Sequence, residues 1–276
     1  MTSEDGTVSW AELLTETKLR LERGEVDDAD ISARRIIEEA SGHSGSEFHL
    51  GMSDLATERG VAALDRMVAD RLRGRPLQYV VGSWGFRHLD LLVDERVLIP
   101  RPETEHVVEV ALAEFDARPG NRVLDLGTGS GAIGLSVLTE RPHAEVVLTD
   151  RSSAALQVAR ANLAGVGRAA TRATLLEGSW FEALEAEHDG AFTLIISNPP
   201  YVAPDDPLPA VVAEWEPTDA LIAADGGFSD IATLIADASR YLTSDGLAAA
   251  RGRGRDQDDE ARAGRLGRDP RARRER

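Results

Sequence analysis

The stretch VLDLGTGSG at residues 123–131 decides the predicted fold. Its first residues are mainly apolar, as in a strand buried on both faces, and its glycines allow the backbone to turn tightly and to approach a ligand. A helix that begins after the last glycine would present its unpaired N–H groups at this turn. The stretch therefore predicts a strand, a turn and a helix. Taken alone, the turn fits a dinucleotide, a nucleoside cofactor or no ligand.

On both sides of this stretch, short apolar runs alternate with segments of helical periodicity. Strands are predicted at 145–148, 173–176 and 192–196, and helices at 152–163 and 231–242. Strands without polar alternation are typical of a parallel sheet that helices cover on both faces. The fold class is therefore α/β, with a Rossmann-like domain over residues 106–250.

The chain before this domain has a different pattern. Apolar residues recur at helical spacing between residues 8 and 75, with turn residues at 42–51, which predicts a small helical domain over residues 1–76. Two β-prone runs at 79–81 and 89–93 predict a β-hairpin. Residues 77–105 are therefore predicted to form a hairpin connector and a loop.

The end of the chain departs from this organisation. After Gly246, the segment 247–276 holds ten arginines against six acidic residues and little large aliphatic side chain. The run Ala248-Ala249-Ala250-Arg251 does not have the pattern of a core strand. We therefore expect the C-terminal strands of the sheet to be missing, and residues 251–276 to be a disordered or out-of-frame tail.

Composition excludes several functions. The formal net charge is −17, with 48 acidic and 31 basic residues, whereas a protein that binds nucleic acid stably normally has a basic surface. The chain has no cysteine, and its six histidines do not fall at metal-ligand spacing, so we expect no metal site. It also has no long apolar stretch, so we expect neither a membrane span nor a signal peptide, and a cytoplasmic location.

A second candidate site element follows the predicted strand at 192–196. Residues 198–201 read Asn-Pro-Pro-Tyr, and two prolines cannot continue a sheet ladder, which leaves their carbonyls free to face a ligand. The strand at 145–148 leads to Asp150, an acid suited to ribose hydroxyls. Ligands in such sheets bind at the carboxyl ends of the strands, so these elements are expected to meet there.

Together with these motifs, three further stretches carry a family resemblance: RPLQY at 75–79, VLIPRPETE at 97–105, and Glu216-Pro217 with Ala220-Leu221. With the helical N-terminal domain, they resemble the release factor glutamine methyltransferase family (PrmC, also called HemK) over roughly residues 10–246. The resemblance implies methyl transfer from S-adenosylmethionine to the N5 amide nitrogen of the glutamine in the Gly-Gly-Gln motif of class I release factors. It also implies that the helical domain binds the substrate, and we expect a monomer.

The resemblance assigns the site residues. Cofactor-binding residues would be Gly127, Thr128, Gly129, Ser130, Gly131, Asp150, Trp180 and Asn198, with Trp180 beside the adenine. Substrate-binding residues would be Asn198, Pro199, Pro200 and Tyr201. Of these, Asn198, Pro199 and Tyr201 would be catalytic, because the Asn198 side-chain oxygen and the Pro199 carbonyl can accept the amide hydrogens while Tyr201 packs on the amide.

Some expectations stay open. The family commonly has an acid where this chain has Ser179, which puts one adenine contact in doubt. Arg101, Glu103 and Glu105 match the family's loop, with local ion pairs or caps as the alternative, and they are not assigned as catalytic. Alternative functions are methylation of a ribosomal-protein glutamine, adenine-N6 methylation of DNA, or an inactive truncated product.

Overall fold

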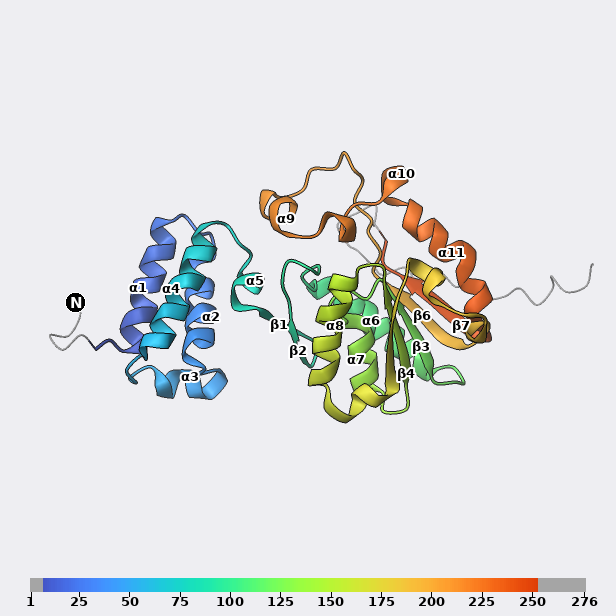
Figure 1. Ribbon diagram of the computed structural model, residues 1–276, viewed down its shortest axis with the longest axis horizontal. Coiled ribbons are helices and arrows are strands. Elements are labelled where there is room, and N and C mark those ends of the chain that lie inside the picture. Colours follow the sequence, from blue (N-terminus) through green and yellow to red (C-terminus); the bar gives the residue numbers. More distant parts are fainter. Residues whose placement is uncertain (1–6, 253–276) are drawn as a thin grey trace, which may run out of the picture. The chain divides into compact units, whose positions relative to one another are not determined.

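The computed structural model describes residues 7–252, and the chain divides into two compact units, residues 1–83 and residues 84–276, which we describe separately. The described part of the first unit is helical (Figure 1). Its helices are α1 (Trp10–Arg23), α2 (Ala29–Ser41), α3 (Gly45–Gly51), α4 (Glu58–Leu72) and α5 (Leu77–Val81).

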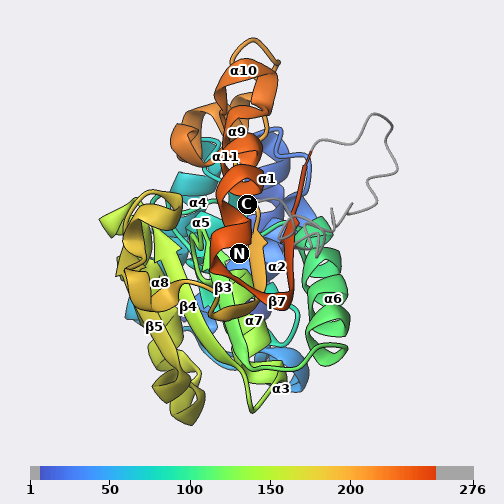
Figure 2. The same cartoon turned by 90° about the vertical axis from the view of Figure 1, so that its right-hand side faces the viewer.

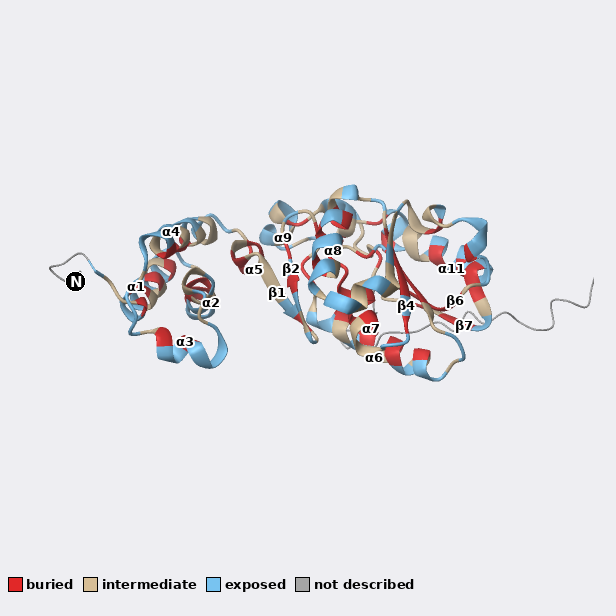
Figure 3. Ribbon diagram, turned by 60° about the horizontal axis from the view of Figure 1, so that its bottom comes forward, coloured by how far each residue is buried: buried red, intermediate tan, exposed pale blue. Residues whose placement is uncertain are grey.

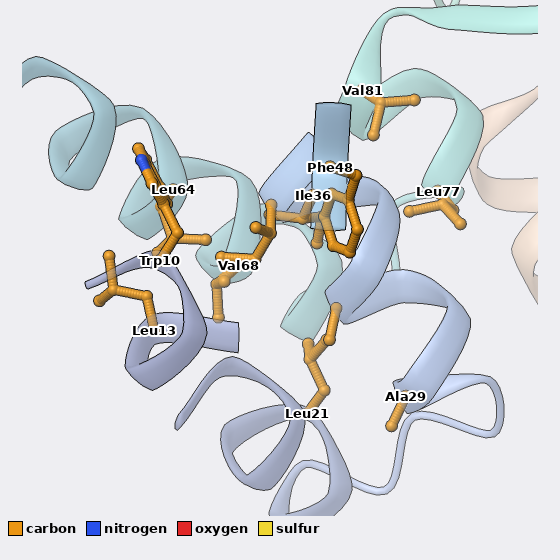
Figure 4. Packing of buried hydrophobic residues seen from close by; sticks show 12 residues of the cluster. Trp10, Leu13, Leu21, Ala29, Ile36, Phe48, Leu64, Val68, Leu77 and Val81 are labelled. Carbon is orange, nitrogen blue, oxygen red and sulfur yellow. The ribbon is translucent and has the colours of Figure 1, made fainter. Parts of the chain in front are cut away.

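One buried cluster holds these helices together (Figure 4). Its members come from all five helices: Trp10, Leu13, Leu21, Ala29, Ala33, Ile36, Ile37, Phe48, Leu64, Val68, Leu77 and Val81. The first helix begins with a capping box, in which the side chains of Ser9 and Glu12 each accept the other's backbone N–H. The predicted helical character of this region is confirmed.

Two local predictions in this region are wrong. Residues 79–81, predicted as a strand, form part of α5, because Leu77 and Val81 lie four positions apart and both enter the helical core. Residues 42–51, predicted as a turn, contain α3, which buries Phe48. In both places tertiary packing overrides the local preference of the residues.

A two-stranded sheet, β1 (Ser83–Phe86) and β2 (Leu89–Leu92), follows α5, so its first strand lies after the predicted run at 79–81. Arg87 lies in the turn with a φ of 51°. Its guanidinium donates to both carboxylate oxygens of Glu140 at 2.6 and 2.8 Å, and its backbone N–H donates to Glu105 Oε1 at 3.0 Å. These bonds attach the turn to α6 (Pro102–Asp116) and α7 (Ala132–Glu140).

The second unit is built around a five-stranded sheet. Its strands are β3 (Arg122–Leu126), β4 (Glu145–Asp150), β5 (Ala173–Glu177), β6 (Phe192–Ser197) and β7 (Leu242–Ala250). Their order is β5-β4-β3-β6-β7, and every neighbouring pair is parallel. The strands β3, β4 and β6 are among the most buried parts of the unit (Figure 3), because helices cover both faces of the sheet.

Helices α6, α7 and α8 (Ser153–Gly165) cover one face, and α11 (Ser229–Tyr241) covers the other (Figure 1). The remaining helical segments are α9 (Ala210–Trp215), α10 (Ala224–Gly227) and the 3₁₀ turns Gly167–Arg172, Trp180–Ala183, Ala186–His188 and Thr218–Ala220. This architecture confirms the predicted fold, a Rossmann-like α/β domain that follows a helical N-terminal region in the sequence.

The prediction that no core strand follows Gly246 is wrong. Residues 247–250 lie in β7 and pair with residues 194–197 of β6 (Figure 2). The backbone groups of β6 on this side require partners, and a run of alanines can supply them because ladder hydrogen bonds do not involve side chains. Leu247 is buried and Arg251 N donates to Ser197 O at 3.1 Å. The predicted tail lies, from residue 253 onwards, outside the described residues.

Within residues 7–252, every helix is too short or too polar to span a membrane. No group of three or more histidine, aspartate or glutamate side chains there has the arrangement of a metal site.

Candidate active site

A cavity of about 590 Å³ opens at the carboxyl ends of the strands β3, β4, β5 and β6. The loops that follow these strands contribute most of its wall. Nine residues predicted from the sequence line it: Gly127, Thr128, Gly129, Ser130, Asp150, Trp180, Asn198, Pro199 and Pro200. The cavity therefore lies at the sheet edge where the sequence predicted a site. All residues that line the cavity belong to the second unit.

The glycine turn after β3 requires its glycines. Gly127, Gly129 and Gly131 have φ values of 69°, 56° and 87°, in the region that side chains with a Cβ avoid. A Cβ on Gly129 would meet no atom within 4 Å, so the cavity reaches its backbone. Gly131 does not line the cavity and instead precedes α7 as its N-cap.

The buried carboxylate of Asp125 is hydrogen-bonded to this turn and to the helix after it. Asp125 Oδ2 accepts hydrogen bonds from Thr128 Oγ1 at 2.6 Å and from Gly134 N at 2.9 Å. Its Oδ1 has no hydrogen-bond partner within the described part of the chain. Complete burial raises the pKa of Asp125 to about 6, although the two hydrogen bonds favour its charged form.

The acid at the end of β4 bonds to the same turn. Asp150 Oδ2 accepts from Gly129 N at 2.9 Å, and its Oδ1 accepts from Ser152 N at 2.9 Å. The carboxylate is thereby fixed at the cavity wall beside the glycine backbone. An acid in this position can accept hydrogen bonds from ribose hydroxyls, as the sequence predicted for Asp150.

Trp180 lies on the other side of the glycine turn. A Cβ on Gly127 would lie 3.5 Å from Cζ3 of Trp180, so the indole packs directly on the glycine backbone. Its Nε1–H donates to Asp230 Oδ1 at 3.2 Å, and Asp230 also lines the cavity. The backbone of Trp180 has a φ of 48°, which costs free energy for a residue with a side chain. The indole is thus held as a flat apolar wall.

Asn198 brings an unsatisfied acceptor to the cavity. It follows β6, whose Ser197 pairs with Leu126 of β3 and donates through Oγ to Leu126 O at 2.8 Å. The side-chain oxygen of Asn198 is buried and has no hydrogen-bond partner among residues 7–252. Because a buried acceptor without a donor costs free energy, this oxygen is suited to a ligand that brings an N–H group.

Tyr201, which completes the motif, does not line the cavity. Its ring lies under the guanidinium of Arg251, 5.3 Å from Cζ to the ring centroid. Arg251 follows directly after β7, so the last strand of the sheet reaches the loop that bears Asn198. The sequence placed Tyr201 against the substrate amide, whereas in the structure its ring lies outside the cavity wall.

Sequence reasoning missed the role of Glu216. Its side chain is 2% exposed and accepts from Arg101 Nη2 at 2.5 Å and from Ile99 N at 3.2 Å. A local ion pair was one alternative for Arg101, and its partner in the structure lies 115 positions away in the sequence. Arg101 and Pro217 both line the cavity, so this pair joins two segments of its wall.

Asn162 was also missed. Its buried side chain donates to Ser130 O in the glycine turn at 2.8 Å. It also accepts from Leu92 N at 2.7 Å and donates to Leu92 O at 3.0 Å, as a neighbouring strand would. The sequence carries no signal for this contact, because Asn162 is a single asparagine within a helix. Arg101 and Glu216, in contrast, lie in stretches that resemble the family.

The fold and the site define a Rossmann-like methyltransferase: the family model described as "Methyltransferase small domain" matches residues 105–215. The model "PrmC N-terminal domain" matches residues 12–82. With the curated relatives, these matches show that the chain belongs to the release factor glutamine methyltransferase family.

Three relatives named "Release factor glutamine methyltransferase" illustrate the similarity. The one from Xylella fastidiosa (strain 9a5c) is 45% identical over 65% of this chain and 64% of its own length, just under two thirds. The one from Escherichia coli (strain K12) is 37% identical over 80% of this chain and 76% of its own length. The one from Agrobacterium fabrum (strain C58) is 36% identical over 88% and 83%.

Proposed function

We propose that this chain transfers a methyl group from S-adenosylmethionine to the N5 amide nitrogen of the glutamine in the Gly-Gly-Gln motif of class I release factors. The observation that carries the proposal is the buried, unpartnered side-chain oxygen of Asn198, one strand away from the glycine turn. Release factors act at the ribosome, so the proposal places the chain in the cytoplasm.

The residues of the cavity fit the cofactor. Gly129 leaves open space over its backbone, and the fixed carboxylate of Asp150 can accept the ribose hydroxyls. The indole of Trp180 offers a flat surface for the adenine. When bound there, S-adenosylmethionine supplies an electrophilic methyl group on a sulfonium centre. These residues would bind and orient it.

Asn198 and Pro199 would prepare the substrate amide. A carboxamide nitrogen is a weak nucleophile because its lone pair is delocalised into the carbonyl. If the Asn198 side-chain oxygen and the Pro199 carbonyl accept its two hydrogens, the amide is held with its nitrogen facing the methyl group. The nitrogen then gains a bond to carbon as the carbon–sulfur bond breaks, and it loses one proton to solvent. No strong general base is required.

Tyr201 has a supporting role in this proposal. Its ring lies against Arg251 rather than in the cavity wall, so it would hold the loop that presents Asn198, Pro199 and Pro200. The two proline rings restrict this loop because each fixes its own φ angle. The acceptors would therefore be held in place before the substrate arrives.

The proposal is tested by transfer of a radiolabelled methyl group to an unmodified release factor. Asn198→Ala should lower kcat about 100-fold, as loss of a transition-state hydrogen-bonding group does, while the cofactor Kd changes less than threefold. Glu214→Ala, on exposed α9, is the matched control and should retain activity. A release factor with Gln→Ala in its Gly-Gly-Gln motif should receive no label.

Other acceptors separate this proposal from its alternatives. A ribosomal-protein glutamine and an adenine-containing DNA duplex are offered in parallel reactions. Preferred labelling of either would contradict the release-factor assignment. Equal losses of kcat and cofactor affinity in Asn198→Ala would contradict the role of Asn198.

A further inference from the structure

We propose that Asp230 accepts a hydrogen bond from the exocyclic amino group of the cofactor's adenine, and that it selects an amino-purine over other bases. This inference rests on the proposed function, because it concerns the same cavity. It adds a specificity-determining residue from α11, a helix in which the sequence indicated no site residue.

The position of Asp230 carries the argument. Asp230 lines the cavity together with Trp180, and its Oδ1 accepts from the indole Nε1–H at 3.2 Å. A base that stacks on the indole therefore has a carboxylate at the edge of the stacking surface. A purine stacked on the indole presents its hydrogen-bonding groups along its own edge, beside the edge of the indole at which this carboxylate lies.

Asp230 also has unused capacity. Among the described residues its only hydrogen bond is the one to Trp180, and it forms no ion pair there. A carboxylate can accept about four hydrogen bonds, so Oδ2 is available to a ligand. Of the cavity's other carboxylates, Asp150 is assigned to the ribose hydroxyls in the proposed function, and Asp219 pairs with Arg151 at 3.3 Å.

The chemistry of the base decides what Asp230 would select. Adenine carries an amino group at position 6, which donates, whereas hypoxanthine carries an oxo group there, which would face the carboxylate with like partial charge. A hydrogen bond to a charged acceptor contributes about 1.5–3 kcal/mol, equivalent to about a 10- to 100-fold difference in Kd. Removing the 6-amino group should therefore raise the Kd of the ligand only in a protein that has the Asp230 carboxylate.

The test measures binding by calorimetry and requires no turnover. The full chain is titrated with S-adenosylhomocysteine and with its analogue in which hydrogen replaces the 6-amino group. In the wild-type protein, the analogue should bind at least tenfold more weakly. In Asp230→Ala, the two ligands should bind with Kd values within about twofold of each other.

Three further variants isolate the effect. Asp237→Ala removes the same charge from an exposed position of α11 and should keep the wild-type discrimination. Trp180→Phe keeps an aromatic surface but removes the Nε1–H that holds Asp230, so its discrimination should be weaker than that of the wild-type protein. Asp230→Asn, which preserves the shape of the side chain, should discriminate to an intermediate extent, because its oxygen still accepts.

The outcomes are distinct. If Asp230→Ala weakens both ligands by the same factor, Asp230 only positions Trp180 and this inference is wrong, while the proposed function stands. If the wild-type protein binds the two ligands equally, the inference is also wrong. If the wild-type protein does not bind S-adenosylhomocysteine, the proposed function itself fails.

Discussion

Asp125 lies fully buried under the glycine turn, where Thr128 and Gly134 donate to one of its oxygens. Its pKa is raised from 3.8 to about 6, chiefly because burial penalises the charged form. In the unfolded chain the same carboxyl is solvated and ionises at lower pH. Between about pH 4 and pH 6 the unfolded chain therefore binds fewer protons than the folded chain, and the contribution of Asp125 to stability falls as pH rises.

Asp125→Asn should remove this dependence, because an amide does not titrate. The free energy of unfolding of the wild-type protein, minus that of the variant, should fall as the pH rises from about 4 to about 6 and should then level off. Urea unfolding at pH 4 to 8 measures this difference. A difference that stays constant, or that rises with pH, would contradict the raised pKa.

Asp116→Asn provides the opposite control. The pKa of Asp116 is lowered from 3.8 by its hydrogen bonds with Arg141, so its stabilising contribution is lost as the pH falls rather than as it rises. The same difference measured for this variant should fall as the pH is lowered below about 4, so for this pair the unfolding series is extended to about pH 2.

Site residues that directly follow a strand could be predicted from the sequence. Site residues that lie on helices could not. Asp150 and Asn198 each follow an apolar run that leads to the sheet edge, and parallel strands bring such positions together. Asp230 and Asn162 lie on helices, where a polar residue is usually solvent-facing, and their contacts depend on how each helix packs.

At the scale of elements, the segment at 97–101 is joined to the segment after α9 by one buried carboxylate. Glu216 satisfies both the guanidinium of Arg101 and the backbone N–H of Ile99. Removing one partner of a buried pair leaves the other charge uncompensated, which costs far more than an exposed pair contributes.

Glu216→Ala should therefore lower the free energy of unfolding by about 3 kcal/mol. It should also weaken cofactor binding, since Arg101 and Pro217 line the cavity. Denaturant unfolding and calorimetry measure the two effects. Glu214→Ala, two residues away and exposed, should change neither by more than about 0.5 kcal/mol. An unchanged stability of Glu216→Ala would show that the pair contributes nothing net.

The elements themselves were predicted unevenly. The strands β3, β4 and β6 were found because each is an apolar run buried between helices, so its residues carry the signal. β5, at the end of the strand order and only partly buried, was found from its apolar residues alone. β7 was not, since its alanines form a strand only because β6 offers an unpaired edge. α5 was misassigned because Val80 and Val81 favour strands locally, whereas its place in the core depends on α2 and α4.

At the scale of the whole molecule, the N-terminal unit has a hydrophobic cluster made only of residues between Trp10 and Val81. Residues 1–83 expressed alone should therefore fold, with helical circular dichroism and a cooperative thermal transition. A unit of this size is expected to be only marginally stable, at about 3–5 kcal/mol. Ile36→Ala, which empties a fully buried position, should abolish the transition. A non-cooperative melt of the unsubstituted unit would contradict its independence.

The register between β3 and β6 sets Leu126 opposite Ser197, so the two loops that follow leave the sheet from adjacent strands. Adjacent strands are about 4.8 Å apart, and a hydrogen-bonded ladder cannot stretch. For inhibitor design, this means that a nucleoside fragment and an amide fragment can be joined by a linker of only a few bonds. Because the scaffold already fixes the separation, a rigid linker of the right length should lose less entropy on binding than a flexible one.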